Sequence, residues 1–115
     1  MSALPVIAIF DIGKTNKKFF LFNENYEIVF EKSTRLIEST DEDGFPCENL
    51  EKLTLLVFES LEEVFRLKKF KVTTVNFSTY GASFVYVDKD GKPLTHLYNY
   101  LKPFPNELSE RFYAT

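Results

Sequence analysis

The stretch Ile7–Asn23, IAIFDIGKTNKKFFLFN, decides the predicted fold, because it holds two apolar runs of strand length separated by one polar turn. Val6–Phe10 is an uninterrupted apolar run, which is typical of a strand covered on both faces. Lys18–Phe22 is a second, phenylalanine-rich run, and a polar turn follows at Asn23–Asn25. Short turns between apolar runs predict antiparallel neighbours, so we interpret the stretch as strand, tight turn and strand.

A third strand is predicted over Tyr26–Leu36, and a polar loop over Ser39–Pro46. From Asn49 to Lys69 the apolar residues recur with a helical period, and acidic residues at the start with basic residues at the end suit the helix dipole. Val72–Phe77 follows as a strand, and the order strand, helix, strand favours a parallel, right-handed crossover. The residues that fall on one stripe of this helix are Leu50, Leu53, Val57, Leu61, Val64 and Lys68, widened by Leu56 and Phe65. The acidic residues are Glu48 and Glu51, and the basic residues are Arg66, Lys68 and Lys69.

Further along the chain, Phe84–Val87 is predicted as a strand, Asp88–Gly91 as a hairpin turn and Lys92–Tyr100 as the return strand. Asn106 is predicted to cap a second helix that begins at Glu107. Residues 1–115 are therefore expected to form one α/β domain with a mixed sheet that opens β-β-β-α-β. This order is the opening of the ribonuclease-H-like fold, although a fold alone does not give a function.

The composition excludes several classes of protein. Hydrophobic residues make up 44% of the 115, which is globular, and the net charge of −3 makes nucleic acid a poor partner. The single cysteine, Cys47, and the single histidine, His96, exclude an internal disulfide and a zinc site built on several such ligands. No leader sequence opens the chain and no apolar run reaches the ~20 residues of a membrane helix, so we expect a cytoplasmic protein.

The turn between the first two strands has the residue types that a polyphosphate requires. Gly13 lets the backbone approach closely, and Thr15 and Asn16 offer side-chain and backbone donors. A carboxylate at the end of a buried strand suits hydrated Mg²⁺, and two lysines add positive charge. The residues predicted to bind the nucleotide are Asp11, Gly13, Lys14, Thr15, Asn16 and Lys17, with Asp11 also holding Mg²⁺ through water.

An ordinary hairpin turn is the alternative, since these residue types are common in turns for conformational reasons alone. A P-loop is excluded, although Gly13-Lys14-Thr15 imitates its end. The earlier glycine of that motif falls at Ala8 within the strand, and a strand follows where a P-loop requires a helix.

Two segments carry a resemblance to a known family. VIAIFDIGKTNKKFFLFN (6–23) resembles the first phosphate motif of the actin-like ATPase superfamily, which includes sugar kinases and Hsp70-type chaperones. STYGASFVYVDKDGKPL (78–94) resembles the corresponding stretch of FGGY-family carbohydrate kinases, and is closest to the rhamnulokinase branch. The resemblance implies ATP-dependent, Mg²⁺-assisted phosphorylation of a hydroxyl on a small sugar or sugar-like alcohol.

The resemblance also implies a sugar pocket, and here the sequence departs from the family. Ser83 replaces an acidic residue, Tyr100 replaces the Asp that binds sugar hydroxyls, and Lys102 replaces an Arg. Either the substrate differs or Asn99 takes over the polar contact; alternatively, the two tyrosines only pack on a sheet edge. The residues that the resemblance assigns to the substrate are Gly81, Ala82, Ser83, Tyr98, Asn99 and Tyr100.

In this family the catalytic base, the second phosphate motif and the adenosine pocket lie further downstream. We therefore expect the chain to be the N-terminal portion of a longer kinase, to need the missing C-terminal half as its partner, and to be inactive alone. An apolar face left open by truncation predicts self-association into a homo-oligomer. Two rival hypotheses remain: a non-catalytic nucleotide- or sugar-binding regulatory module on the same fold, and an actin-like ATPase of chaperone or cytoskeletal type.

Overall fold

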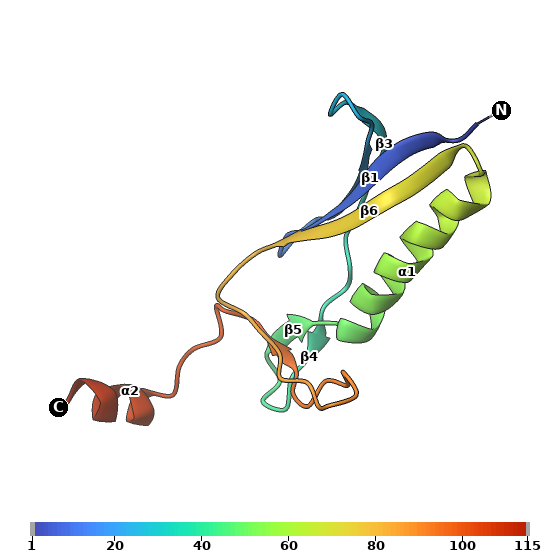
Figure 1. Cartoon of the computed structure of the whole chain (residues 1–115). Coiled ribbons are helices and arrows are strands. Elements are labelled where there is room, and N and C mark those ends of the chain that lie inside the picture. Colours follow the sequence, from blue (N-terminus) through green and yellow to red (C-terminus); the bar gives the residue numbers. More distant parts are fainter. Residues whose placement is uncertain (1, 115) are drawn as a thin grey trace.

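The computed structural model describes residues 2–114, and its first three strands form the predicted antiparallel meander (Figure 1). β1 (Leu4–Ile12) pairs with β2 (Lys17–Phe22), which pairs with β3 (Ile28–Thr34). β3 begins two residues later than predicted, because Tyr26 belongs to the preceding turn and adopts the left-handed conformation (φ 62°). The Asn23 side chain closes that turn by accepting from the backbone N–H of Glu27 at 3.0 Å.

A long helix then returns the chain to the start of the sheet. α1 (Leu50–Leu67) is capped by the Asn49 side chain, which accepts from the Lys52 N–H at 3.0 Å, and it ends at Lys68 in the left-handed conformation (φ 58°). β6 (Phe70–Thr79) pairs in parallel with β1, so the sheet has the order β3-β2-β1-β6. The predicted β-β-β-α-β order and the mixed sheet are confirmed.

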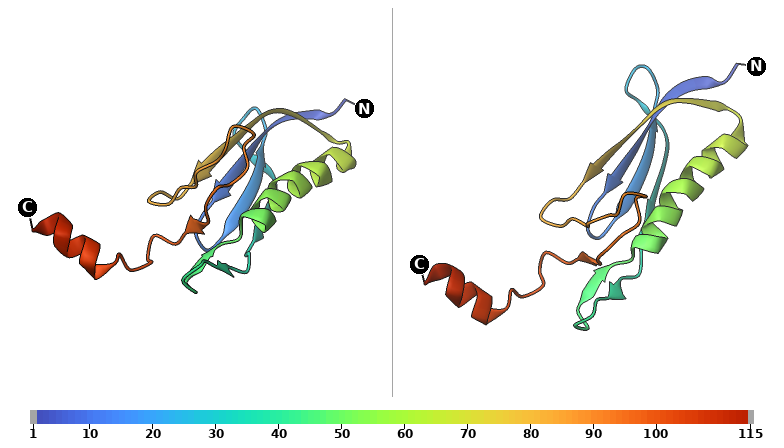
Figure 2. Two further views of the ribbon diagram at one scale, coloured as in Figure 1. Left: turned by 90° about the horizontal axis from the view of Figure 1, so that it is seen from below. Right: turned by 60° about the horizontal axis from the view of Figure 1, so that its bottom comes forward.

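The core lies between α1 and one face of this sheet (Figures 1 and 2). Val6, Ala8 and Phe10 are fully buried beneath the helix, whereas Ile7 and Ile9 between them are only half-buried. The prediction that Val6–Phe10 is covered on both faces is therefore wrong for the described residues, since α1 covers only one face. The core cluster comprises Val6, Ala8, Phe10, Ile12, Phe19, Leu21 and Val64.

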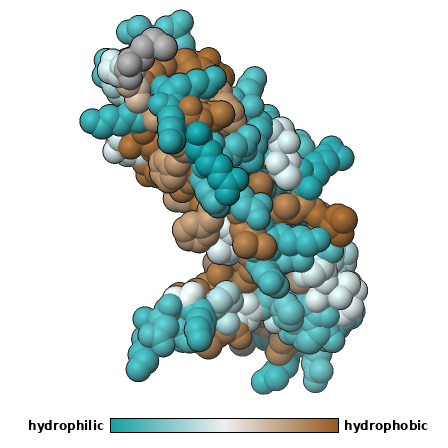
Figure 3. Space-filling model, turned by 90° about the vertical axis from the view of Figure 1, so that its right-hand side faces the viewer, coloured by the Kyte–Doolittle hydropathy of each residue, from teal (hydrophilic) through white to brown (hydrophobic). Residues whose placement is uncertain are grey.

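The outer side of the helix is less polar than its pattern predicts. Phe65, expected in the buried stripe, is 59% exposed, and Leu55 and Phe58 are also exposed. Apolar patches accordingly interrupt the charged surface in the space-filling view (Figure 3).

A second, smaller sheet lies beyond the end of the first (Figure 1). It consists of β4 (Ser39–Thr40), β5 (Pro46–Glu48) and β7 (Leu97–Tyr98), all antiparallel, with β5 in the middle. The predicted loop Ser39–Pro46 is thus a turn with a short strand at each end. Asp41 closes it, because its carboxylate accepts from the backbone N–H groups of Asp43 and Phe45 at 2.8 and 3.1 Å.

The Asp88–Gly91 turn is confirmed, with Gly91 at φ 80° and its N–H bonded to the Asp88 carbonyl at 3.0 Å. Its predicted arms are largely wrong: Phe84–Val87 forms only an isolated bridge from Val87 to Pro93, and Lys92–Tyr100 is a strand only over β7. Pro93 has no N–H to continue a ladder, and the segment is mostly exposed.

α2 (Asn106–Tyr113) lies apart from both sheets in every ribbon view (Figure 2). Pro105 occupies the cap position and no side chain caps the helix, so the predicted cap at Asn106 is wrong by one residue. Neither this helix nor α1 is long and apolar enough to cross a membrane.

Candidate functional site

The turn between β1 and β2 consists of Gly13–Asn16 and is closed by the last strand pair, Ile12 with Lys17. The Gly13 N–H donates to the Asn16 carbonyl at 2.9 Å. A Cβ at Gly13 would lie 2.8 Å from that carbonyl oxygen, so the close approach requires glycine. Thr15 and Asn16 are exposed, and the turn therefore presents donors to solvent at the carboxyl end of β1.

Asp11 lies on β1 just before this turn, between Lys18 of β2 and Ser78 of β6 in register. It is half-buried, and within residues 2–114 its carboxylate has no ion-pair or hydrogen-bond partner. No group of three or more metal-ligating side chains occurs in the part of the chain that the structure describes. A single free carboxylate suits Mg²⁺, which keeps most of its waters.

Lys17 is placed differently from the other predicted phosphate residues, because its side chain is buried. Its ammonium donates to the Glu48 carboxylate at 3.0 Å and to the Lys14 carbonyl at 2.8 Å. The Tyr80 hydroxyl donates to the same Glu48 oxygen at 3.1 Å. Burial, and then the Glu48 charge, raise the pKa of Tyr80 to about 12.

Sequence reasoning assigned Glu48 to the helix dipole and gave Tyr80 no role. Glu48 instead ends β5 and pairs with a lysine 31 positions earlier in the chain. Arg35 was also missed: its Nε donates to the Asn16 side chain at 3.2 Å, which adds a cation beside the turn. No period or spacing in the sequence indicates either pair.

Lys14 connects the turn to the second predicted site. Its ammonium lies 6.0 Å from the centre of the Tyr100 ring, and that ring lies 6.0 Å from the ring of Tyr80. The nucleotide-binding and substrate-binding predictions thus fall on neighbouring parts of the molecule.

A pocket of about 200 Å³ lies beside Tyr100. The Ser83 hydroxyl donates across it to the Tyr98 carbonyl at 2.9 Å, and the Asn99 side-chain oxygen accepts from the Leu101 N–H at 2.8 Å. Of the predicted substrate residues, only Gly81 is not among those that line it. The lining residues are Ala82, Ser83, Phe84, Tyr86, Thr95, Tyr98, Asn99 and Tyr100.

Ion pairs lie next to the pocket, beside the Tyr98 ring that lines it. Lys102, expected to replace a family arginine, contacts the carboxylates of Asp41 and Asp43 at 2.9 and 2.8 Å. These carboxylates raise the pKa of Lys102, and Lys102 in turn lowers the pKa of Asp41. The Tyr98 hydroxyl donates to Glu42, so this tyrosine is anchored rather than only packed on a sheet edge.

The chain shares its fold with solved kinases of small hydroxylated compounds. It matches a Plasmodium falciparum glycerol kinase with ADP at a TM-score of 0.81 and 17% identity, over 100% of this chain and 24% of that one. A ligand-bound xylulose kinase from Lactobacillus acidophilus gives 0.67 and 22%, over 81% and 19%. A gluconate kinase from the same organism gives 0.61 and 21%, over 82% and 19%.

The structural similarity establishes the fold alone, which is the predicted ribonuclease-H-like, actin-like ATPase fold. The chain spans about a quarter of the glycerol kinase and a fifth of the other two. No family model and no curated protein matches the sequence.

Proposed function

We propose that the chain forms part of an ATP-dependent kinase that phosphorylates a hydroxyl group of a small sugar or sugar-like alcohol. The position of Lys14 carries this proposal. Its backbone belongs to the turn proposed to bind phosphate, and its ammonium lies over Tyr100, which lines the pocket. Phosphoryl transfer depends mainly on holding donor and acceptor side by side, and the nearness of the turn to the pocket supports the proposal.

In the proposed complex, the N–H groups of the turn and the Thr15 hydroxyl bind the phosphates of ATP. Asp11 holds the hydrated Mg²⁺, and Lys14 reaches the transferred phosphoryl group. Asn16 is oriented by Arg35, and Lys17 acts through its bond to the Lys14 carbonyl. The proposed FGGY family membership is supported by the kinds of kinase that share the fold. Within that family, the resemblance of residues 78–94 is our reason to propose the rhamnulokinase-like branch.

The pocket suggests what the acceptor is like. Its volume of about 200 Å³ is below the roughly 300–1,000 Å³ of sites for drug-sized ligands, which favours a molecule of a few carbon atoms. No carboxylate or histidine occurs among its lining residues, so the base that takes the hydroxyl proton comes from outside this lining. We therefore propose that the chain alone does not turn over and depends on a further, C-terminal part.

The lack of a carboxylate in the lining also favours a second candidate function, a regulatory module that binds nucleotide or sugar without transferring phosphate. The test is transfer of labelled phosphate from MgATP to glycerol, xylulose, gluconate and rhamnulose by a longer protein that contains this chain. Transfer is expected with the longer protein and none with the 115-residue chain. Binding of MgATP without transfer to any acceptor would favour the regulatory module, and the absence of both would refute the proposal.

A further inference from the structure

A buried carboxylate connects the proposed phosphate turn to the rest of the site. Glu48 and Lys17 have side chains only 7% and 2% exposed, and one oxygen of Glu48 accepts from both Lys17 and Tyr80. Lys17 links Glu48 to the turn, since its ammonium also donates to the Lys14 carbonyl.

These contacts close into a ring. From Lys14 the path runs through Lys17, Glu48 and Tyr80 to the Tyr100 ring, and from there back to the Lys14 ammonium. Its members come from the Gly13–Asn16 turn, the start of β2, the end of β5, the residue after β6 and the segment after β7. The path therefore holds the backbone of Lys14 through a hydrogen bond, and its ammonium lies near the Tyr100 ring.

Stability alone does not account for this arrangement. A buried ion pair gives little net stability compared with apolar side chains of the same volume, because both charges lose their water. In some proteins a pair of this kind instead specifies one geometry, when further hydrogen bonds satisfy both charges. Here the second bond of the lysine goes to a carbonyl of the turn itself, so the geometry that it fixes is that of the turn.

We propose that Glu48 is a positioning residue, which holds the Gly13–Asn16 turn in the conformation that binds the nucleotide. That the ligand is a nucleotide rests on the proposed function. That Glu48 controls the conformation of the turn does not depend on it. Glu48 touches neither the turn's exposed donors nor the pocket lining, and it acts through Lys17 and Tyr80.

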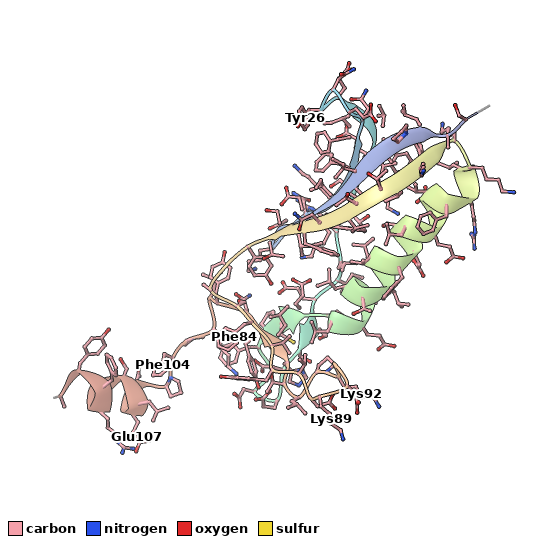
Figure 4. The ribbon with its side chains drawn as sticks, viewed as in Figure 1. Tyr26, Phe84, Lys89, Lys92, Phe104 and Glu107 are labelled. Atoms are coloured by element: carbon pink, nitrogen blue, oxygen red, sulfur yellow. The ribbon has the colours of Figure 1, made fainter. Side chains whose placement is uncertain are left out.

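Two conservative variants test this role in the 115-residue chain. Glu48→Gln keeps the shape of the side chain but removes its charge. Tyr80→Phe removes one hydroxyl and leaves the Lys17–Glu48 ion pair intact, so it tests the role even if Glu48→Gln does not fold. Glu63→Gln and Tyr26→Phe are the matched controls. Glu63 pairs with Lys32 on the surface, and Tyr26 lies in the β2–β3 turn at the far end of the molecule (Figure 4).

The first measurement is hydrogen exchange of single amides by NMR. The Gly13 N–H, bonded to Asn16, reports on the turn, and the Gly91 N–H, bonded to Asp88, is the internal reference. In both test variants we expect Gly13 to exchange about tenfold faster and Gly91 to stay unchanged. Unchanged Gly13 exchange would overturn the proposal. Equal acceleration of both amides would also overturn it, since that indicates a general loss of stability.

The second measurement is the affinity for MgATP by calorimetry. The dissociation constant is expected to rise about tenfold in Glu48→Gln and to stay unchanged in the two controls. If the unaltered chain binds MgATP and Glu48→Gln binds it equally well, the positioning role is refuted. If no form of the chain binds MgATP while Gly13 alone responds in exchange, the proposed function fails for this chain and the control of the turn by Glu48 stands.

Discussion

Replacement of Gly13 by alanine tests the geometry of the turn most directly. The added Cβ would lie 2.8 Å from the Asn16 carbonyl oxygen, a backbone atom that cannot rotate away. Relief of such a contact costs about 1–3 kcal/mol, whereas the reduced freedom of the unfolded chain returns about 0.4–1 kcal/mol. The net expectation is a loss of about 1–2 kcal/mol in the free energy of unfolding, together with weaker binding of MgATP.

Urea unfolding followed by far-UV circular dichroism measures this loss, since the chain has no tryptophan. The matched control is Gly81→Ala, because nothing lies within 4 Å of its new Cβ and it has no positive φ. We expect this control to be as stable as the unaltered chain or slightly more stable. Equal stability of Gly13→Ala and Gly81→Ala would refute the inference that the turn requires glycine.

Three other outcomes are expected from the same structure. Because the pKa of Tyr80 is raised to about 12, its neutral form stabilises the fold fully below pH 10, and this contribution is lost as the pH rises from about 10 to about 12. Thermal melts should therefore show a steeper loss of stability over this range in the unaltered chain than in Tyr80→Phe, and parallel curves would contradict the Glu48–Tyr80 contact. Leu21→Ala, at a fully buried position, is expected to lower the free energy of unfolding by about 2–5 kcal/mol, whereas Leu94→Ala, at a position 64% exposed, should change it by less than about 0.5 kcal/mol; similar urea midpoints would refute this placement of the core. β6 has a paired neighbour on only one side within residues 2–114 and exposes Phe77, so Phe77→Lys should reduce self-association in sedimentation, and an unchanged distribution would exclude this edge as the contact.

The regular elements were predictable because each depends on a local pattern. The helical period over Asn49–Lys69 gave the limits of α1 to within two residues, and the short turns between the first three apolar runs gave the meander. The strands around the Asp88–Gly91 turn were not predictable in the same way. Their apolar residues are typical of paired strands with a buried face. In the structure, however, Phe84 and Tyr86 are exposed, and the two arms are joined only by the isolated bridge between Val87 and Pro93. A pattern predicts which residues can be buried, not whether another element is present to bury them.

The site was predictable only in part for a related reason. Gly13 and Thr15 belong to a local turn, so their residue types indicate its chemistry directly. The partners that hold the turn are far away in the chain: Glu48 is 31 residues from Lys17, and Tyr80 is 32 residues from Glu48. Such pairs depend on which strand ends meet in space, and a single sequence does not record that.

The topology nevertheless contains the reason that these strand ends meet. β1 and β6 are parallel, and their ladder ends at the pair Ile12 and Thr79, so both strands stop at the same edge of the sheet. The Tyr80 N–H continues the ladder to the Ile12 carbonyl at 3.1 Å, and the Gly13–Asn16 turn and the pocket loop therefore leave the sheet side by side. Ligand sites at the carboxyl ends of parallel strands arise in this way. The prediction of a parallel crossover thus already implied that residues 13–16 and 80–83 are neighbours, although the two sites were inferred from separate segments of the sequence.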